Sequence, residues 1–246
     1  MLEINKIYCM DCLEGMKQLE DNSVDITITS PPYNAGDNVR GTFYDEYSDN
    51  LSTDEYYNFI KNTITELIRV NKYYVFFNFQ VLSGNKMAYL QLLSDFKENI
   101  KDIIIWHKTS VQPSIQPTRL NSAFEFVIVF AKKELAEKQI FERAFFNNRV
   151  RGQLNNNVIH MKNASNESFE GRNENKAIYP VDFVKWFLQK FTDKGDLVLD
   201  PFMGSGTTAV ACKELHRNFI GFELSAQYCD IANARLDKWK GQTTLF

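Results

Sequence analysis

Strand-like and helix-like patterns of apolar residues alternate along the first half of the chain. Val24 to Thr29 is a β-branched run, and apolar runs at 73–79 and 124–130 also predict strands. Ser52 to Glu55 has the Ser-x-x-Glu form of a capping box, and apolar residues follow it at helical spacing. This alternation is typical of a mainly parallel sheet with helices on both faces, which is an α/β fold.

The pattern breaks down between 132 and 174, where the sequence is Asn-rich and charged with little periodicity. Order returns at Pro180, a residue suited to a helix start, and Gly195 is predicted to end that helix. Strands at 197–199 and 219–222 follow, each with a helical pattern after it. We therefore expect residues 1–246 to form a single domain, with 132–174 as an embedded insertion.

Composition narrows the class of protein. At 246 residues with 44% hydrophobic content, the chain can bury a full core. No stretch approaches the ~20 apolar residues of a membrane span, and the N-terminus has no basic segment followed by an apolar one. The sequence thus predicts a cytoplasmic protein without a membrane partner.

Four cysteines are too few and too scattered for a disulfide framework in a chain of this length. Cys9 and Cys12 form a C-x-x-C pair, but no second pair exists and only three histidines are present. We expect reduced thiols and no metal, with zinc or thiol-redox chemistry as the minor alternative.

A glycine-rich turn is predicted between a strand and a helix at Asp200 to Ala209 (DPFMGSGTTA). Gly204, Gly206 and Ala209 fit the G-x-G-x-x-G/A spacing of nucleotide-binding turns, whose glycines let the backbone approach a ligand. Glu223 ends the next strand, where a carboxylate can accept hydrogen bonds from two ribose hydroxyls. A glycine turn followed by a carboxylate at the end of the next strand predicts a ligand that contains adenosine. The alternative is a turn that serves only to pack the helix.

Ser30-Pro31-Pro32-Tyr33 directly follows a predicted strand, and two prolines cannot continue it. An exocyclic amine of a nucleic-acid base is a poor nucleophile, because its lone pair is delocalised into the ring. The Ser30 hydroxyl and the Pro31 carbonyl can accept hydrogen bonds from the two N–H groups of such an amine, and the prolines stiffen the loop. Tyr33 offers a flat ring to a base that has left its stack. A polyproline turn that binds an aromatic groove is the alternative.

Together these two motifs resemble those of the amino-methyltransferases of bacterial restriction-modification systems and their solitary relatives. In that family a D/N/S-P-P-Y/F tetrapeptide is catalytic and a DPF-x-GSGTT turn binds S-adenosylmethionine. The catalytic motif comes first here, which is similar to the beta arrangement of the family. The resemblance implies a circularly permuted, Rossmann-like methyltransferase fold that acts on double-stranded DNA.

Smaller matches extend the resemblance. Residues 9–16 are similar to the family's N-terminal G-D-C-L element, and 175–180 to its H-P-A-x-F-P segment at the methionine end of the cofactor. The residues 106–108 and 124–126 look like the family's paired late strands. The implied cofactor-binding residues are Asp11, Cys12, Lys176, Asp200, Phe202, Gly204, Ser205, Gly206, Thr207, Thr208 and Glu223.

The resemblance also bears on the target base. Family members with Ser at the first catalytic position mostly methylate cytosine, and those with Asp mostly adenine. Ser30 therefore implies the 4-amino group of cytosine, with the 6-amino group of adenine as the alternative. A methyltransferase for RNA or protein and a non-catalytic nucleotide-binding module are the remaining classes.

DNA contacts are expected in the insertion. The formal net charge is −3, yet the segment 143–162 carries only basic charges, on Arg143, Arg149, Arg151 and Lys162. Such side chains can hold phosphates, while the Asn and Gln residues among them can read base edges. A solvated polar insertion is the alternative. The short insertion also makes a homodimer and a cognate restriction endonuclease candidate partners.

Overall fold

The computed structural model describes residues 2–35, 50–110, 120–145, 156–163 and 179–240. Within these residues, eight strands form one sheet in the order β1-β8-β7-β2-β3-β5-β4-β6. Only β5 runs antiparallel to its neighbours, so the sheet is mostly parallel as predicted. The strands are β1 (Lys6–Cys9), β2 (Val24–Thr29), β3 (Asn71–Phe79), β4 (Ile100–Lys108), β5 (Phe124–Phe130), β6 (Val158–Met161), β7 (Leu197–Asp200) and β8 (Asn218–Glu223).

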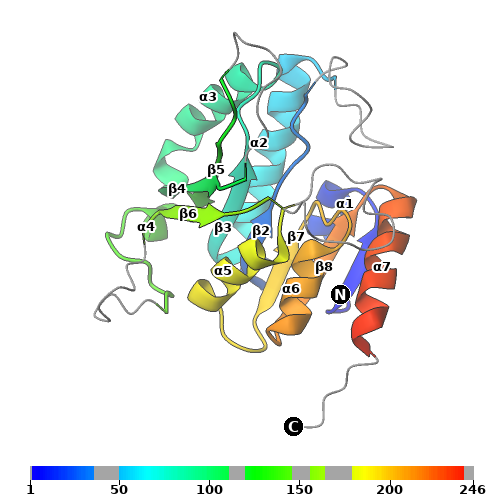
Figure 1. The fold of residues 1–246 in the computed structure, drawn as a ribbon. Coiled ribbons are helices and arrows are strands. Elements are labelled where there is room, and N and C mark those ends of the chain that lie inside the picture. The colour runs from blue at the N-terminus through cyan, green and yellow to red at the C-terminus, as the bar shows by residue number, and fades with distance from the viewer. Residues whose placement is uncertain (1, 36–49, 111–119, 146–155, 164–178, 241–246) are drawn as a thin grey trace.

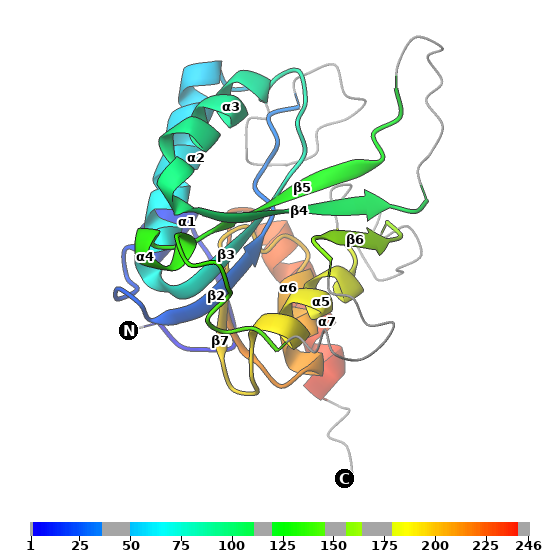
Figure 2. The same cartoon turned by 90° about the vertical axis from the view of Figure 1, so that its left-hand side faces the viewer.

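Helices cover both faces of this sheet, which confirms the α/β prediction (Figure 2). One face packs against α1, α2 and α3, and the other against α5, α6 and α7, each with its own buried apolar cluster. The helices are α1 (Cys12–Met16), α2 (Thr53–Val70), α3 (Lys86–Asp95), α4 (Lys133–Ala136), α5 (Val181–Phe191), α6 (Thr207–Glu214) and α7 (Ala226–Lys240), and a 3-10 turn covers Lys97–Asn99. No helix in the described ranges has the length and apolar character that crossing a membrane requires.

The start of α2 shows how local sequence sets an element boundary. The backbone N–H of Glu55 donates to Ser52 Oγ at 3.3 Å, and the Ser52 N–H donates to Glu55 Oε2 at 3.0 Å. Two helix N-terminal groups are therefore satisfied reciprocally, as the capping box predicted. The apolar residues after the box, including Tyr56, Ile60 and Leu67, are buried against the sheet.

The segment 132–174 contains two elements that the pattern did not predict, α4 and β6. Strand β6 pairs in parallel with β4 and extends the main sheet at its edge. Its one deeply buried side chain is Ile159, which is 3% exposed. A four-residue edge strand with one inward apolar residue carries almost no periodic signal, which explains why sequence reasoning missed it.

The centre of the sheet places the two predicted motifs side by side (Figure 1). Strands β2 and β7 are direct parallel neighbours, with Ile26 opposite Val198 and Thr27 opposite Leu199. The chain leaves β2 towards β3 on one side and leaves β7 towards β8 on the other. Ligands of open α/β sheets bind at such a switch point, in the crevice beyond the carboxyl ends of the strands. Ser30 and Pro201 follow directly at those ends.

Candidate functional site

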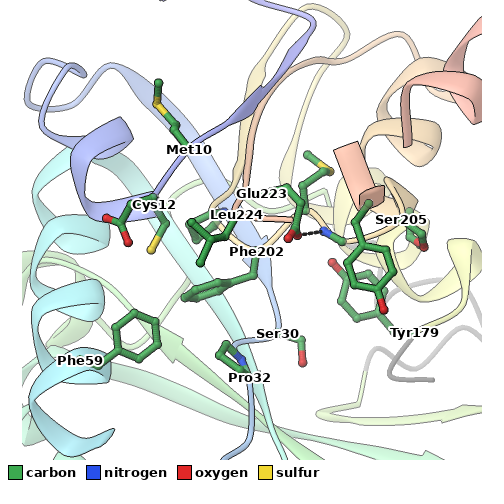
Figure 3. Close-up of a pocket in the computed structure, with 16 residues that line it drawn as sticks. Met10, Cys12, Ser30, Pro32, Phe59, Tyr179, Phe202, Ser205, Glu223 and Leu224 are labelled. Atoms are coloured by element: carbon green, nitrogen blue, oxygen red, sulfur yellow. Dashed lines mark hydrogen bonds between the residues drawn. The ribbon is translucent and has the colours of Figure 1, made fainter. Parts of the chain in front are cut away.

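A cavity of about 290 Å³ opens at this switch point (Figure 3). Ser30 and Pro32 line it from the loop after β2, and Gly204 and Glu223 line it from β7, β8 and the turn between them. Its full lining is Met10, Asp11, Cys12, Ser30, Pro32, Phe59, Tyr179, Pro201, Phe202, Met203, Gly204, Ser205, Thr207, Glu223, Leu224 and Tyr228. The fold therefore brings both sequence motifs to one cavity, although most of the chain separates them.

The glycine turn holds the Glu223 carboxylate in place. The Gly204 N–H donates to Glu223 Oε2 at 2.7 Å (Figure 3). The Ser225 N–H donates to Glu223 Oε1 at 2.9 Å. Burial raises the pKa of Glu223, which these two hydrogen bonds partly offset. Gly206 adopts a φ of +84°, and a Cβ there would lie 2.9 Å from the Cβ of Ala232. The turn thus needs glycine at 206 for its backbone and its packing against α7.

Asp200 lies behind the cavity wall and links it to the diproline loop of Ser30 to Tyr33. Its carboxylate is fully buried and accepts hydrogen bonds from Thr29 Oγ1 at 2.7 Å, Thr208 Oγ1 at 2.6 Å and the Tyr179 hydroxyl at 2.9 Å. The Phe202 N–H also donates to it, at 3.1 Å. Burial raises the pKa of Asp200, and its hydrogen bonds counteract that. Because Thr29 precedes Ser30, Asp200 couples the glycine turn to the diproline loop.

The N-terminal end of the cavity is formed by the segment that resembles a G-D-C-L element. Asp11 caps α1, with Oδ1 accepting from the N–H groups of Leu13 at 2.9 Å and Glu14 at 3.1 Å. Cys12 is buried beside it, which raises the pKa of its thiol to about 12. A thiol with a raised pKa stays protonated at neutral pH and is a poor nucleophile.

Hydrogen bonds and burial hold the backbone of the diproline loop in place. Pro31 and Pro32 are buried, the Tyr56 hydroxyl donates to the Pro32 carbonyl at 2.8 Å, and Asn85 Nδ2 donates to the Tyr33 carbonyl at 2.7 Å. Within the described part of the chain, no donor approaches the Pro31 carbonyl. Of the three successive carbonyls, the one expected to accept a hydrogen bond from the substrate is therefore the one left available by the protein.

The predicted cofactor residues divide into three groups. Seven line the cavity: Asp11, Cys12, Phe202, Gly204, Ser205, Thr207 and Glu223. Asp200, Gly206 and Thr208 instead shape the turn from behind it. Lys176 lies outside the described residues, as do Arg149 and Arg151 of the predicted DNA contacts. Among the described residues, no three His, Cys, Asp or Glu side chains are grouped so that they could hold a metal ion.

Sequence reasoning missed several residues of the site. Phe59 on α2 contacts Phe202 edge to face with the ring centroids 5.9 Å apart, and both rings line the cavity. Arg235 on α7 donates to the Ser205 carbonyl at 2.6 Å and so supports the glycine turn. Apolar wall residues such as Phe59 follow the same helical pattern as core residues, so sequence carries no signal that separates them. Tyr179, which also lines the cavity, could have been predicted, because it belongs to the segment that resembles H-P-A-x-F-P.

Arg143, one of the predicted DNA contacts, forms ion pairs within the protein. Its guanidinium pairs with Asp193 at 3.2 Å and with Asp196 at 2.8 Å, and it lies 5.2 Å from the Tyr73 ring centroid. Asp196 precedes β7, so these contacts lie at the amino ends of the strands, whereas the cavity is at their carboxyl ends. Arg143 therefore ties the segment after α4 to the sheet. Lys162, by contrast, is exposed just after β6, at the carboxyl end of that strand.

We expect Arg143→Ala to lower the free energy of unfolding by about 2 kcal/mol, because it leaves the largely buried Asp196 carboxylate without its charged partner. DNA affinity should stay unchanged, whereas Lys162→Ala should weaken DNA binding without changing stability. Urea denaturation and fluorescence titration with a DNA duplex measure the two quantities. Weaker DNA binding and unaltered stability in Arg143→Ala would contradict this prediction and would show that Arg143 contacts DNA.

The chain is similar to known methyltransferases in sequence and in fold. The chain is 28% identical over 250 residues to the Type II methyltransferase M.HpaI of Haemophilus parainfluenzae, covering 94% of this chain and 74% of that protein. Among solved structures, it is similar to the PvuII DNA methyltransferase, described as cytosine-N4-specific, with a TM-score of 0.74 and 20% identity over 93% of this chain and 85% of that one. It also resembles the complex of M1.HpyAVI with SAM, with a TM-score of 0.59 and 24% identity over 94% and 98% of the two chains.

The similarity to solved structures supports the fold. A match to a sequence model identifies the family. The sequence model of the family described as DNA methylase matches residues 24–234, a range that begins with β2 and ends within α7. It includes both the diproline loop and the glycine turn that line the cavity. This protein therefore belongs to the DNA methylase family.

Proposed function

We propose that this DNA methylase transfers a methyl group from S-adenosylmethionine to the exocyclic 4-amino group of a cytosine flipped out of double-stranded DNA. The observation that carries the proposal is the single cavity lined by Ser30 and Pro32 on one side and by Gly204 and Glu223 on the other. Methyl transfer needs donor and acceptor atoms in line at contact distance, and a shared cavity supplies that proximity.

The residues of the cavity fit this cofactor. Glu223 presents a carboxylate whose remaining lone pairs can accept hydrogen bonds from ribose hydroxyls. Phe202 and Leu224 supply apolar surface for an adenine ring, next to Asp11 and Cys12. M1.HpyAVI, which has a similar fold, has been solved with SAM bound. S-adenosylmethionine supplies an electrophilic methyl group on a positively charged sulfur.

The chain's own residues prepare the amine. Ser30 Oγ and the Pro31 carbonyl accept hydrogen bonds from the two N–H groups of the amine. These hydrogen bonds draw the nitrogen towards the tetrahedral geometry of the transition state. The buried prolines and the bonds to the Pro32 and Tyr33 carbonyls hold these acceptors in position before the base arrives. Such preorganisation contributes a few kcal/mol of transition-state stabilisation in other enzymes. The Tyr33 ring is the proposed stacking surface for the flipped base.

Two considerations favour cytosine over adenine. Ser30 occupies the first catalytic position, which the resemblance associates mostly with cytosine enzymes. The PvuII methyltransferase, described as cytosine-N4-specific, also shares this fold. Adenine N6 is the alternative target of the same chemistry.

Labelled S-adenosylmethionine incubated with the protein and duplex DNA of mixed sequence tests the proposal. We expect mass spectrometry of the digested DNA to find N4-methylcytosine. N6-methyladenine would overturn the choice of base, and labelled RNA or protein beside unlabelled DNA would overturn the substrate class.

We further propose that 132–174 reads the target sequence, with Arg149, Arg151 and Lys162 on phosphates. A homodimer and a cognate restriction endonuclease complete the proposed restriction-modification setting.

We expect the affinity for S-adenosylmethionine to fall as the pH is lowered, starting above the ordinary glutamate pKa of 4.5. Burial raises the pKa of Glu223, so this carboxyl takes up a proton at a higher pH than an exposed glutamate does. A protonated carboxyl loses acceptor capacity towards the ribose hydroxyls. Isothermal titration calorimetry between pH 8 and about pH 5 measures the dissociation constant. Affinity that stays constant down to pH 5 would contradict the role assigned to Glu223.

A further inference from the structure

A network of polar side chains lies behind Ser30 and connects the catalytic loop to the antiparallel part of the sheet. The Tyr33 hydroxyl lies 2.7 Å from Ser30 Oγ and donates to Glu125 Oε2 on β5 at 3.1 Å. Lys108 on β4 forms an ion pair with the other carboxylate oxygen of Glu125. Glu125 is 7% exposed and the Lys108 side chain is 13% exposed. Burying two charges is costly, so this pair requires an explanation beyond stability.

Every group that faces Glu125 in this network is a hydrogen-bond donor. Asn78 Nδ2 donates to Glu125 Oε2 at 2.6 Å and to the Tyr33 hydroxyl at 2.9 Å. Lys108 compensates the negative charge, and its ammonium also lies 5.4 Å from the Trp106 ring centroid. The network is therefore built around a carboxylate that only accepts hydrogen bonds.

Counting protons gives the direction of each hydrogen bond. Tyr33 has one hydroxyl proton, and the acceptor-only carboxylate of Glu125 takes it. The phenolic oxygen can then only accept from Ser30, so the contact at 2.7 Å uses the Ser30 proton. With its proton directed into the network, Ser30 Oγ presents lone pairs to the cavity that it lines.

We propose that Glu125 and the Tyr33 hydroxyl are positioning residues that make Ser30 Oγ an obligate hydrogen-bond acceptor for the target amine. The inference rests on the proposed function and explains how a serine can act where a carboxylate would accept more strongly. A hydroxyl that donates to a chain ending on a carboxylate becomes a stronger acceptor, because hydrogen bonds in series polarise one another. Tyr33 would thus act twice, through its ring on the base and through its hydroxyl on Ser30.

Glu125→Gln tests this directly, because it keeps the shape of the side chain and changes its protons. Lys108 carries only donors and will hold the amide oxygen, which turns the amide NH₂ towards Tyr33. Tyr33 then accepts from residue 125 and donates to Ser30, and the Ser30 proton turns towards the substrate amine. We expect kcat to fall about tenfold or more. The cofactor dissociation constant and the KM for DNA should change less than about twofold, because Glu125 is buried and does not line the cavity.

A double-mutant cycle separates this effect from general damage to the sheet. Tyr33→Phe keeps the ring and removes the hydroxyl, so it should lower kcat by itself. In that background, Glu125→Gln should cause no further loss of kcat, because the link to Ser30 is already cut. Glu66→Gln is the matched control, since it neutralises the partner of Arg69 on α2, away from the cavity lining. We expect Glu66→Gln to retain wild-type kcat.

Wild-type kcat in Glu125→Gln or in Tyr33→Phe would overturn the inference. So would an equal loss from Glu125→Gln with and without the Tyr33 hydroxyl, since that would show an effect that does not pass through Ser30. The proposed function fails by a different result, namely the absence of DNA methylation by the unaltered protein. The two failures are therefore distinguishable within one set of assays.

Discussion

Ser30→Ala is expected to lower kcat about 100-fold and leave the dissociation constant of S-adenosylmethionine nearly unchanged, by analogy with the loss of one preorganised group that stabilises a transition state. The Ser30 hydroxyl lines the cavity beside Pro32, and the proposed contact with the amine strengthens only as the nitrogen becomes tetrahedral. Its loss therefore acts on the transition state more than on either bound ligand. Single-turnover methylation of duplex DNA measures the chemical step, and calorimetry measures cofactor binding.

Ser23→Ala is the matched control for this substitution. Ser23 precedes β2 at the opposite end of that strand, and its hydroxyl donates to the Glu20 carbonyl at 2.7 Å. Losing a hydroxyl there removes a comparable hydrogen bond without reaching the cavity lining, so kcat should stay at the wild-type level. If Ser30→Ala and Ser23→Ala proved equally active, Ser30 could not be the acceptor for the amine.

Glu223→Ala is expected to weaken S-adenosylmethionine binding about 100-fold. Each hydrogen bond from a ribose hydroxyl to a carboxylate contributes about 1.5 kcal/mol, so two bonds correspond to about 3 kcal/mol. At saturating cofactor, most of kcat should return, because Glu223 lies on the glycine-turn side of the cavity and the amine acceptors lie across it. Isothermal titration calorimetry gives the dissociation constant, and kcat is measured at several cofactor concentrations.

The carboxylate also accepts from the N–H groups of Gly204 and Ser225, so Glu223→Ala will loosen the turn to some degree. Thermal denaturation of the variant therefore accompanies the binding measurement. Glu134→Ala on α4 serves as the control, because it removes an exposed carboxylate outside the cavity. Cofactor affinity equal to wild type in a folded Glu223→Ala variant would show that the ribose is held elsewhere.

Much of the fold was predictable because its helices and strands follow from local patterns of apolar and polar residues. The bounds of β2 and β5 agree with the predicted runs, and the capping box at Ser52 begins α2 as expected. Edge strand β6 was missed because four residues with one buried side chain give no period to detect. Strand alternation, turn chemistry and helix caps depend on residues within a few positions of one another, so sequence reasoning reaches them.

The site was predictable only where a compact motif carried it. The tetrapeptide Ser30 to Tyr33 and the turn at Asp200 to Thr208 could be read from their residues, because each motif concentrates its chemistry in a short segment. The ion pairs of Arg143 could not be predicted for the complementary reason. A run of basic residues indicates charge, but the partners that neutralise Arg143 lie about 50 positions further along the chain.

By itself, the sequence determined the α/β class, the two motifs and the expectation of a methyltransferase. Only the tertiary structure decided that Asp200 faces Thr29 across 171 positions of sequence, and that Tyr33 meets Glu125 across 92. Neither pairing has a local signature, because the energy of a buried hydrogen bond depends on where the chain brings its partners and not on how they are spaced along it. Parallel pairing of β2 with β7 is the step that joins the two motifs, and with them the acceptor for the amine and the carboxylate for the cofactor.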